Sequence, residues 1–104
     1  SNKNKPDAIF CANDTTALSA ILYLQENGIK IPEDIAIVGF SNEPFSEVVS
    51  PPISTIRQPG FEMGKKAAEL IISQILNKEK VTVFQTITMP TELIIRKSSD
   101  KKQK

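Results

Sequence analysis

The sequence of 104 residues predicts an α/β protein with a short parallel sheet and flanking helices. The first observation is that two short apolar runs, residues 8–12 and 35–40, have the composition of buried strands. The second is that one helical segment with capping residues connects them. Strand, helix and strand in this order form a βαβ unit, in which the strands are parallel and the crossover is right-handed.

Boundary signals define the first strand and its helix. The run AIFCA at residues 8–12 is continuously apolar, which is typical of a strand covered on both faces. Residues 13–16 offer side chains that cap a helix N-terminus, and Gly28 supplies a C-terminal stop. Apolar residues occupy most of the helix circumference, so we expect this helix to be largely buried: Ala17, Leu18, Ala20, Ile21, Leu22 and Leu24.

The middle of the chain continues the alternation. After the second strand, residues 41–50 are polar with scattered apolar side chains, which predicts a loop carrying a helical turn. Pro51 and Pro52 end this loop, and residues 54–57 are predicted as a short strand.

A second helix and two further strands are predicted for the rest of the chain. Residues 58–60, Gln-Pro-Gly, open the helix, because proline is favoured near the first helical position. Apolar side chains then follow helical spacing as far as Ile75. Residues 81–89 and 92–96 are predicted as strands separated at Pro90.

Composition removes several kinds of chemistry. Histidine is absent and Cys11 is the only cysteine, so the chain has neither a Ser-His-Asp nor a Cys-His nucleophile system and no internal disulfide. Cys11 lies in an apolar run and is predicted to be a buried structural thiol. Asp14 and Glu43 come with no base or metal partner. We therefore expect no catalysis, no metal site and no cofactor.

The net charge of +1 conceals an acidic body between basic ends. Residues 6–95 hold six basic and eleven acidic side chains, a net charge of −5, which makes a poor platform for a phosphate backbone. Residues 1–5 are expected to be a tag or a disordered start, and residues 98–104 a disordered basic tail. No stretch approaches the roughly 18 apolar residues of a membrane span.

Polar side chains follow both predicted strands. Asn13 and Asp14 come after the first strand, and Ser41, Asn42 and Glu43 come after the second. In parallel α/β sheets, ligands bind beyond the carboxyl ends of the strands, so these clusters are expected to share one rim. Their mixture of donors and acceptors suits hydroxyl groups or a polar heterocycle. Helix capping is the alternative role for Asn13 and Asp14.

Several segments, in order along the chain, resemble the lactose-repressor/galactose-repressor (LacI/GalR) family of bacterial transcription regulators. No single segment is decisive, but together they span residues 6–98: PDAIFCAND (6–14), IPEDIAIVGF (31–40), PPISTIRQP (51–59), Met63-Gly64 with Ala67, and MPTELIIRKS (89–98). The resemblance implies part of a type I periplasmic-binding-protein-like fold, the C-terminal part of the effector-binding domain.

The resemblance also implies how the chain is divided. Residues 6–57 and 84–97 are expected to belong to the C-terminal lobe, and residues 58–83 to the helix that crosses to the other lobe. That helix would need another cover for its apolar face, such as a second copy of the chain.

Site residues follow from the same resemblance. Family effector contacts fall on Asn13 and on the position after Gly39-Phe40, where the family normally has an aspartate and this chain has Ser41. Asp14 and Asn42 flank these positions, and Gln58 matches a family residue at the crossover. Homodimerisation in the family implicates one set of apolar residues, for which core packing is the alternative: Leu18, Leu22, Phe45 and Val49.

The function implied is effector sensing and dimerisation in a cytoplasmic, DNA-binding regulator with a small polar effector, a sugar. DNA would be bound only through a helix-turn-helix domain absent from these residues, and no membrane contact is expected. A lobe of an extracellular sugar-binding protein, which shares the fold, is the alternative. A small enzyme or phospho-acceptor domain is disfavoured, because Asp14 stands alone at its strand end.

Overall fold

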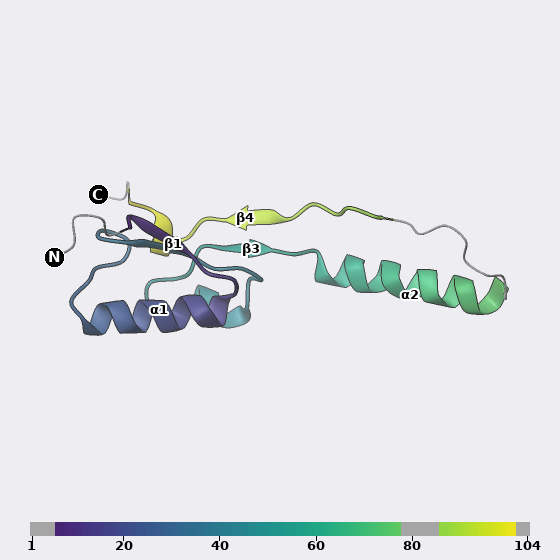
Figure 1. Ribbon diagram of the computed structural model, residues 1–104, viewed down its shortest axis with the longest axis horizontal. Helices are drawn as coiled ribbons and strands as arrows, with labels where there is room; N and C mark the ends of the chain where they lie inside the picture. Colours follow the sequence, from purple (N-terminus) through teal and green to yellow (C-terminus); the bar gives the residue numbers. More distant parts are fainter. Residues whose placement is uncertain (1–5, 78–85, 102–104) are drawn as a thin grey trace. The chain divides into compact units, whose positions relative to one another are not determined.

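The structure is a computed structural model that describes residues 6–77 and 86–101. The chain divides into two compact units, unit 1 with Ser1–Arg57 and Glu92–Lys104, and unit 2 with Gln58–Thr91. Figure 1 shows the elements, which follow in this order: β1 (Ala8–Phe10), α1 (Asp14–Glu26), β2 (Ala36–Val38), the 3-10 helix η1 (Pro44–Glu47), β3 (Thr55–Arg57), α2 (Gly60–Asn77), β4 (Glu92–Ile94) and the 3-10 helix η2 (Lys97–Ser99).

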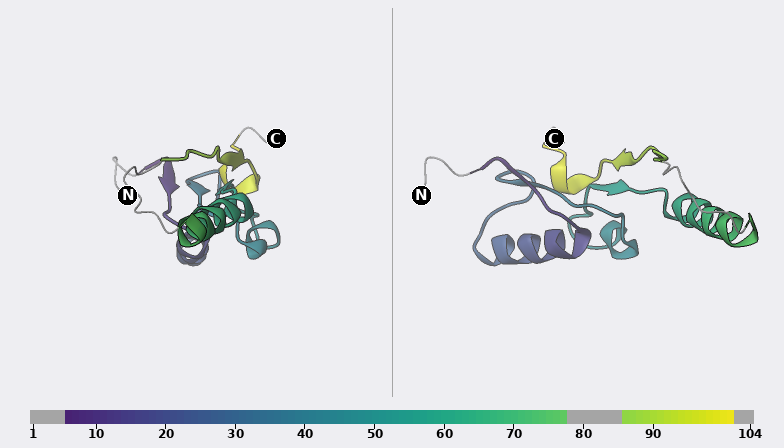
Figure 2. Two further views of the ribbon diagram at one scale, coloured as in Figure 1. Left: turned by 90° about the vertical axis from the view of Figure 1, so that its right-hand side faces the viewer. Right: turned by 45° about the vertical axis from the view of Figure 1, so that its right-hand side comes forward.

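The predicted βαβ unit is confirmed. β1 and β2 pair in parallel, with Ala8 opposite Ala36 and Phe10 opposite Val38. Figures 1 and 2 show α1 lying along one side of this pair. The core lies between the helix and the strands, because α1 directs its most buried side chains at the sheet. Its fully or nearly buried apolar members are Cys11, Ala17, Ile21, Ile31, Ile35, Ile37 and Ile53.

The expectation that the first strand is covered on both faces is wrong. Side chains alternate along a strand, and Ile9 packs against the core, so Phe10 points to the other face. There Phe10 is 61% exposed and meets the ring of Phe40 edge-on, at a centroid distance of 6.5 Å. An apolar run of this length does not distinguish a strand with one covered face from a strand with two.

The first helix begins and ends where the sequence predicts, but it is not largely buried. Asn13 is the N-cap, and Gly28 has a φ of +76°, a left-handed conformation that favours glycine. Ala17 and Ile21 are fully buried, whereas Leu22 is 52% exposed. One sheet buries only one stripe of a helix, so apolar residues outside that stripe face solvent.

The third strand extends unit 1. A parallel bridge joins Val38 of β2 to Ser54, and β3 then pairs antiparallel with β4. The strand predicted over residues 54–57 is therefore confirmed, and the one predicted over 92–96 is present as β4. The strand predicted over residues 81–89 is absent from its described part, residues 86–89, and its remaining residues lie outside the described chain.

The C-terminal segment corrects the expected disordered tail. Lys97–Ser99 forms η2, and Ser98 is completely buried. The Ser98 hydroxyl donates to the Ile37 carbonyl at 2.6 Å and accepts from the Ser54 amide at 2.8 Å. The polar sequence predicted a solvated end because a buried serine with satisfied hydrogen bonds has no sequence signature. The expected start at residues 1–5 and the last three residues lie outside the described chain.

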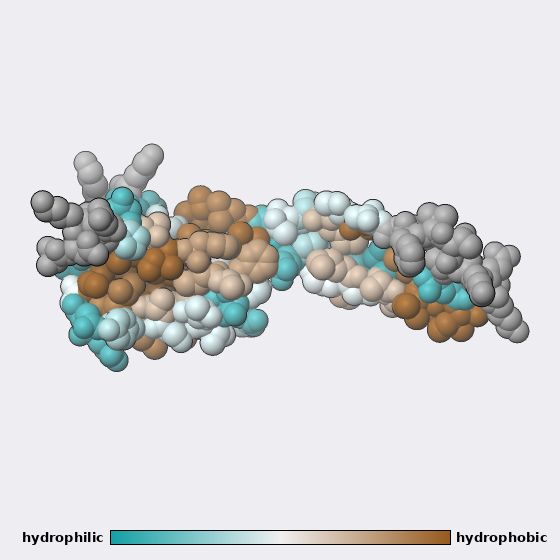
Figure 3. Space-filling view, in the orientation of Figure 1, coloured by the Kyte–Doolittle hydropathy of each residue, from teal (hydrophilic) through white to brown (hydrophobic). Residues whose placement is uncertain are grey.

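In unit 2, the predicted second helix is present as α2. Its apolar side chains lie largely exposed, and hydrophobic residues are visible on its surface in Figure 3. The compact unit that contains this helix runs from Gln58 to Thr91, and the expected crossover over residues 58–83 stays a prediction. Exposed apolar residues of this helix include Phe61, Ile71, Ile72, Ile75 and Leu76.

Candidate functional site

The rim at the carboxyl ends of β1 and β2 brings the two predicted polar clusters together. Phe10 and Val38 are the last register pair, and Asn13 and Ser41 each stand three residues beyond it. A direct contact joins the clusters, because the Glu43 amide donates to Asp14 Oδ2 at 2.6 Å. The prediction that the clusters share one rim is confirmed by this bond.

Asp14 lies beneath the rim rather than on its surface. Its side chain is completely buried, and its second oxygen, Oδ1, accepts from the Thr55 hydroxyl at 2.7 Å. As the first residue of α1, this carboxylate also benefits from the positive end of the helix dipole. Its oxygens are therefore committed to hydrogen bonds within the chain, which corrects the expectation that Asp14 contacts a ligand.

The backbone turns sharply at Ser41 and Asn42. Their φ angles are +100° and +52°, in the left-handed region that non-glycine residues seldom adopt. Residues held there cost roughly 1–3 kcal/mol each and persist where surrounding contacts fix them. The Ser41 amide donates to the Ile56 carbonyl at 2.9 Å, and the Asn42 amide donates to Thr55 Oγ1 at 3.1 Å.

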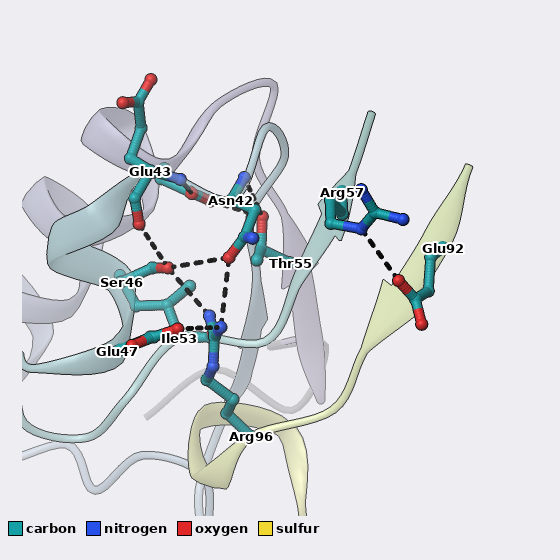
Figure 4. A network of polar contacts seen from close by, with 10 residues as sticks. Asn42, Glu43, Ser46, Glu47, Ile53, Thr55, Arg57, Glu92 and Arg96 are labelled. Carbon is teal, nitrogen blue, oxygen red and sulfur yellow. Dashed lines mark hydrogen bonds and ion pairs between the residues drawn. The ribbon is translucent and has the colours of Figure 1, made fainter. Parts of the chain in front are cut away.

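Arg96 reaches the same turn from the far end of the chain (Figure 4). Its Nη2 donates to Asn42 Oδ1 at 3.1 Å, and its Nη1 donates to Ser46 Oγ at 2.8 Å and to the Ile53 carbonyl at 2.9 Å. Glu47 Oε1 lies 3.5 Å from Nη2, and the Arg96 side chain is 14% exposed. The Asn42 side chain is therefore directed at Arg96, a contact that the sequence did not predict.

Asn13 caps α1 and also lies at the surface. Its Oδ1 accepts from the Thr16 amide at 2.8 Å, so the capping role considered for this residue is present. The side chain is exposed, and within the described chain no hydrogen bond involves its Nδ2. The Ser41 hydroxyl, half-buried, is likewise without a hydrogen bond among the described residues. The rim thus presents an amide donor and a hydroxyl.

The remaining predicted residues occupy different places. Gln58 is exposed and is the first residue of unit 2. Leu18, Phe45 and Val49 are half-buried and pack against the core of unit 1, whereas Leu22 is exposed.

Cys11 is buried, as the sequence predicts, and burial raises the pKa of its thiol above the ordinary value of 9.0. A raised pKa keeps the sulfur in its unreactive thiol form at neutral pH. Among residues 6–77 and 86–101, no group of three or more Cys, Asp or Glu side chains is arranged to hold a metal ion. No described helix combines the length and the apolar character that crossing a membrane requires.

Sequence reasoning missed Thr55 and Arg96. The contact from Asp14 to Thr55 spans 41 residues and that from Arg96 to Asn42 spans 54, so no local pattern pointed to either. The one available signal was Arg96 directly after the apolar run Leu93–Ile95, because a charged side chain that is drawn into the protein beside such a run requires polar partners.

The fold and the rim define a class of protein. The periplasmic binding protein-like domain family matches residues 1–99, and the chain belongs to that family, in the form found in LacI-family transcription regulators. The chain is 41% identical over 100 residues to the HTH-type transcriptional repressor PurR of Vibrio parahaemolyticus, an alignment that covers 95% of this chain and 29% of the relative.

Solved structures agree with this assignment. A LacI family transcriptional regulator from Enterococcus faecalis V583 with bound ribose has a TM-score of 0.83 at 39% identity, covering 93% of this chain and 36% of that one. The lac repressor dimer bound to operator and the anti-inducer ONPF has a TM-score of 0.77 at 30% identity, covering 90% of this chain and 32% of that one. The chain thus spans about a third of the length of the proteins it matches.

Proposed function

We propose that this chain is the effector-sensing and dimerisation portion of a bacterial DNA-binding transcription regulator. The observation that carries the proposal is the rim formed by Asn13 and Ser41, where two polar groups with no hydrogen bond to any residue of the described ranges 6–77 and 86–101 follow parallel strands. Membership of the LacI-family regulators supports it, since these chains bind effectors and DNA. The site is suited to binding rather than to catalysis, because Asn13 and Ser41 offer hydrogen-bonding groups and neither residue is paired with a general base that would activate a nucleophile.

The effector is a small polar molecule, a sugar. Asn13 Nδ2 donates a hydrogen bond and the Ser41 hydroxyl both donates and accepts, which matches the alternating hydroxyls of a sugar. The ribose bound to the Enterococcus faecalis relative supports this class of ligand. Gln58, at the start of unit 2, is a further ligand or hinge residue, whereas Asn42 acts on the site from within the chain.

The regulator is a homodimer whose interface includes four apolar residues of unit 1, the exposed Leu22 and the half-buried Leu18, Phe45 and Val49. The lac repressor dimer on its operator supports both self-association and DNA binding for the regulator as a whole. DNA binding belongs to a helix-turn-helix domain outside these residues, since the body carries a net charge of −5. A regulator of this kind acts in the cytoplasm, where its operator is.

Calorimetry with ribose on the full-length regulator tests the proposal. In Asn13→Asp, a carboxylate oxygen still caps α1, but the amide donor is gone. We expect ribose affinity to fall about fivefold or more, because an unpaired ligand group costs about 1–3 kcal/mol.

Asn27→Asp is the matched control, because Asn27 caps the other end of the same helix and donates to the Tyr23 carbonyl there. It should leave ribose affinity unchanged. If ribose binds and Asn13→Asp has no larger effect than Asn27→Asp, Asn13 is a helix cap only and the proposed contact is wrong.

A further inference from the structure

The turn at Ser41 and Asn42 sets the direction of the Ser41 side chain and is held in an unfavourable conformation. Both residues have positive φ, although neither is glycine. An unconstrained loop would relax to negative φ, which would move the Ser41 hydroxyl away from the rim. The contacts that prevent this relaxation therefore control the geometry of the proposed ligand contact.

The first set of contacts holds the backbone of the turn. Three successive amides, those of Ser41, Asn42 and Glu43, donate to the Ile56 carbonyl, to Thr55 Oγ1 and to Asp14 Oδ2. The Thr55 hydroxyl accepts from Asn42 and donates to Asp14 Oδ1. One buried carboxylate thus holds two consecutive amides, one directly and one through Thr55. The proton on the Thr55 hydroxyl is assigned by this network, since Asp14 can only accept.

The second set of contacts holds the side chains of the turn. Arg96 donates to Asn42 Oδ1 and, through its other terminal nitrogen, to Ser46 Oγ and the Ile53 carbonyl. Ser46 is completely buried and its hydroxyl donates to the Glu43 carbonyl at 2.7 Å. The planar guanidinium supplies several donors at fixed angles, so it fixes Asn42 and η1 together, which a single ammonium group could not do.

Arg96 itself is held firmly by its neighbours in sequence. Its amide donates to Ser54 Oγ at 2.7 Å, and the Ser54 hydroxyl donates to the Arg96 carbonyl at 3.0 Å. On either side, β4 pairs with β3 and Ser98 is buried against β2 and Ser54. The guanidinium therefore projects from a fixed backbone rather than from a free chain end.

We infer that Asp14 and Arg96 are positioning residues that hold the Ser41–Asn42 turn from its backbone and its side chains, and so orient Ser41 toward an effector. The inference rests on the proposed function for the identity of Ser41 as a ligand contact. Neither residue needs to touch the ligand, since Asp14 is fully buried and the Arg96 head is occupied by chain groups.

Amide hydrogen exchange on the 104-residue chain tests the holding of the turn. In Arg96→Met, exchange at Asn42 and Glu43 should accelerate about tenfold or more, because hydrogen bonds to a charged group are worth that factor. The amides of Cys11 and Ala36, which donate to the Val38 and Asp7 carbonyls across β1 and β2, serve as internal references. A merely structural role would accelerate all four amides together.

Two further variants keep the test decisive. Arg57→Met is the matched control, because Arg57 of β3 pairs with Glu92 of β4 at 2.9 Å, with half of its side chain exposed and with no side-chain hydrogen bond to the turn among the described residues. Thr55→Val against Thr55→Ser tests the other arm, the backbone contacts that run through Thr55 to Asp14, and remains available where Arg96→Met fails to fold. Valine removes the shared hydroxyl and should accelerate exchange at Asn42, whereas serine should restore it. Unchanged exchange at Asn42 and Glu43 in Arg96→Met, or equal exchange in the two Thr55 variants, would overturn the inference.

A double-mutant cycle connects the turn to binding. The cycle uses the full-length regulator with ribose as the probe. Arg96→Lys should weaken ribose binding about fivefold when Ser41 is present. The same substitution should have no effect on ribose binding in the Ser41→Ala variant, since the effects of coupled residues are non-additive. Additive effects would overturn the inference. If Ser41→Ala alone leaves ribose affinity unchanged, the proposed ligand contact fails, and the exchange measurements still decide whether Asp14 and Arg96 hold the turn.

Discussion

At the residue scale, Gly39 shows how tightly α1 packs against the end of β2 at the rim. A Cβ placed on this residue would overlap Asp14 Oδ1 and would lie 3.3 Å from the Cβ of Ala17. The Gly39 amide also donates to the Ser54 carbonyl at 2.8 Å, so the end of β2 cannot move away from α1 without breaking this hydrogen bond. Glycine is therefore required here by the close approach of α1 to the end of β2 and not by its backbone angle.

Gly39→Ala should destabilise the chain by about 1–3 kcal/mol, the usual cost of inserting a methyl group into a packed site. The measurement is the midpoint of urea unfolding, with Gly64→Ala as control, because a Cβ at Gly64 meets no atom within 4 Å. Gly64→Ala should be neutral or slightly stabilising, since alanine favours a helix. Equal stability of the two variants would contradict the packing described around Asp14.

Short polar residues beside strands could be located from the sequence, but their roles could not be assigned. Asn13 and Asp14 carried both a ligand-contact and a capping interpretation, and the structure makes Asn13 the cap and Asp14 a buried acceptor. The distinction depends on Thr55 and the Glu43 amide, which approach only after the chain has folded. Local sequence cannot supply such a contact, because it depends on the crossover and on sheet order.

At the element scale, the βαβ unit was the most predictable part of the chain. Continuous apolar strands, a capped helix and a glycine stop are all local signals, and each appears at its predicted position. The C-terminal segment was the least predictable, because η2 is polar and is ordered by two hydrogen bonds of the Ser98 hydroxyl, which donates to Ile37 of β2 and accepts from the amide of Ser54, the residue before β3. Burial of α1 was overestimated for the related reason that the sequence does not reveal how many elements cover it.

Ser98→Ala tests the contribution of η2 to unit 1. The substitution leaves the buried Ser54 amide and the Ile37 carbonyl without their hydroxyl partner, which should cost about 1–3 kcal/mol. Urea unfolding measures the loss, with Ser19→Ala on the exposed side of α1 as the matched control. A wild-type midpoint for Ser98→Ala would restore the interpretation of this segment as a solvated tail.

At the scale of the whole molecule, each compact unit exposes apolar side chains. In unit 1 these include Phe10, Leu22 and Val48, and in unit 2 they lie along α2. Exposed apolar area of this kind marks surfaces that pack against other protein. The chain spans about a third of the length of its relatives. The sequence therefore allowed the family to be expected, but not what covers these surfaces.

The proposed homodimer makes a prediction about Leu22. Because this side chain is half exposed, Leu22→Glu should leave folding stability nearly unchanged and weaken dimerisation of the full-length regulator about tenfold or more, the value of burying one leucine. Analytical ultracentrifugation measures the dimer dissociation constant, and Thr16→Glu at another exposed position of α1 is the control. An unchanged dissociation constant would place the interface elsewhere.

The central claim is that the side chain at position 41 hydrogen-bonds to the effector, and one measurement tests it most directly. Ribose affinity of the full-length regulator is compared by calorimetry for the wild type, Ser41→Ala and Ser41→Asp. A charge-assisted hydrogen bond is worth about 1 kcal/mol more than a neutral one, so Ser41→Asp should bind ribose about fivefold more tightly, and Ser41→Ala more weakly. Equal affinities for all three proteins would contradict the claim, as would Ser41→Asp binding as weakly as Ser41→Ala.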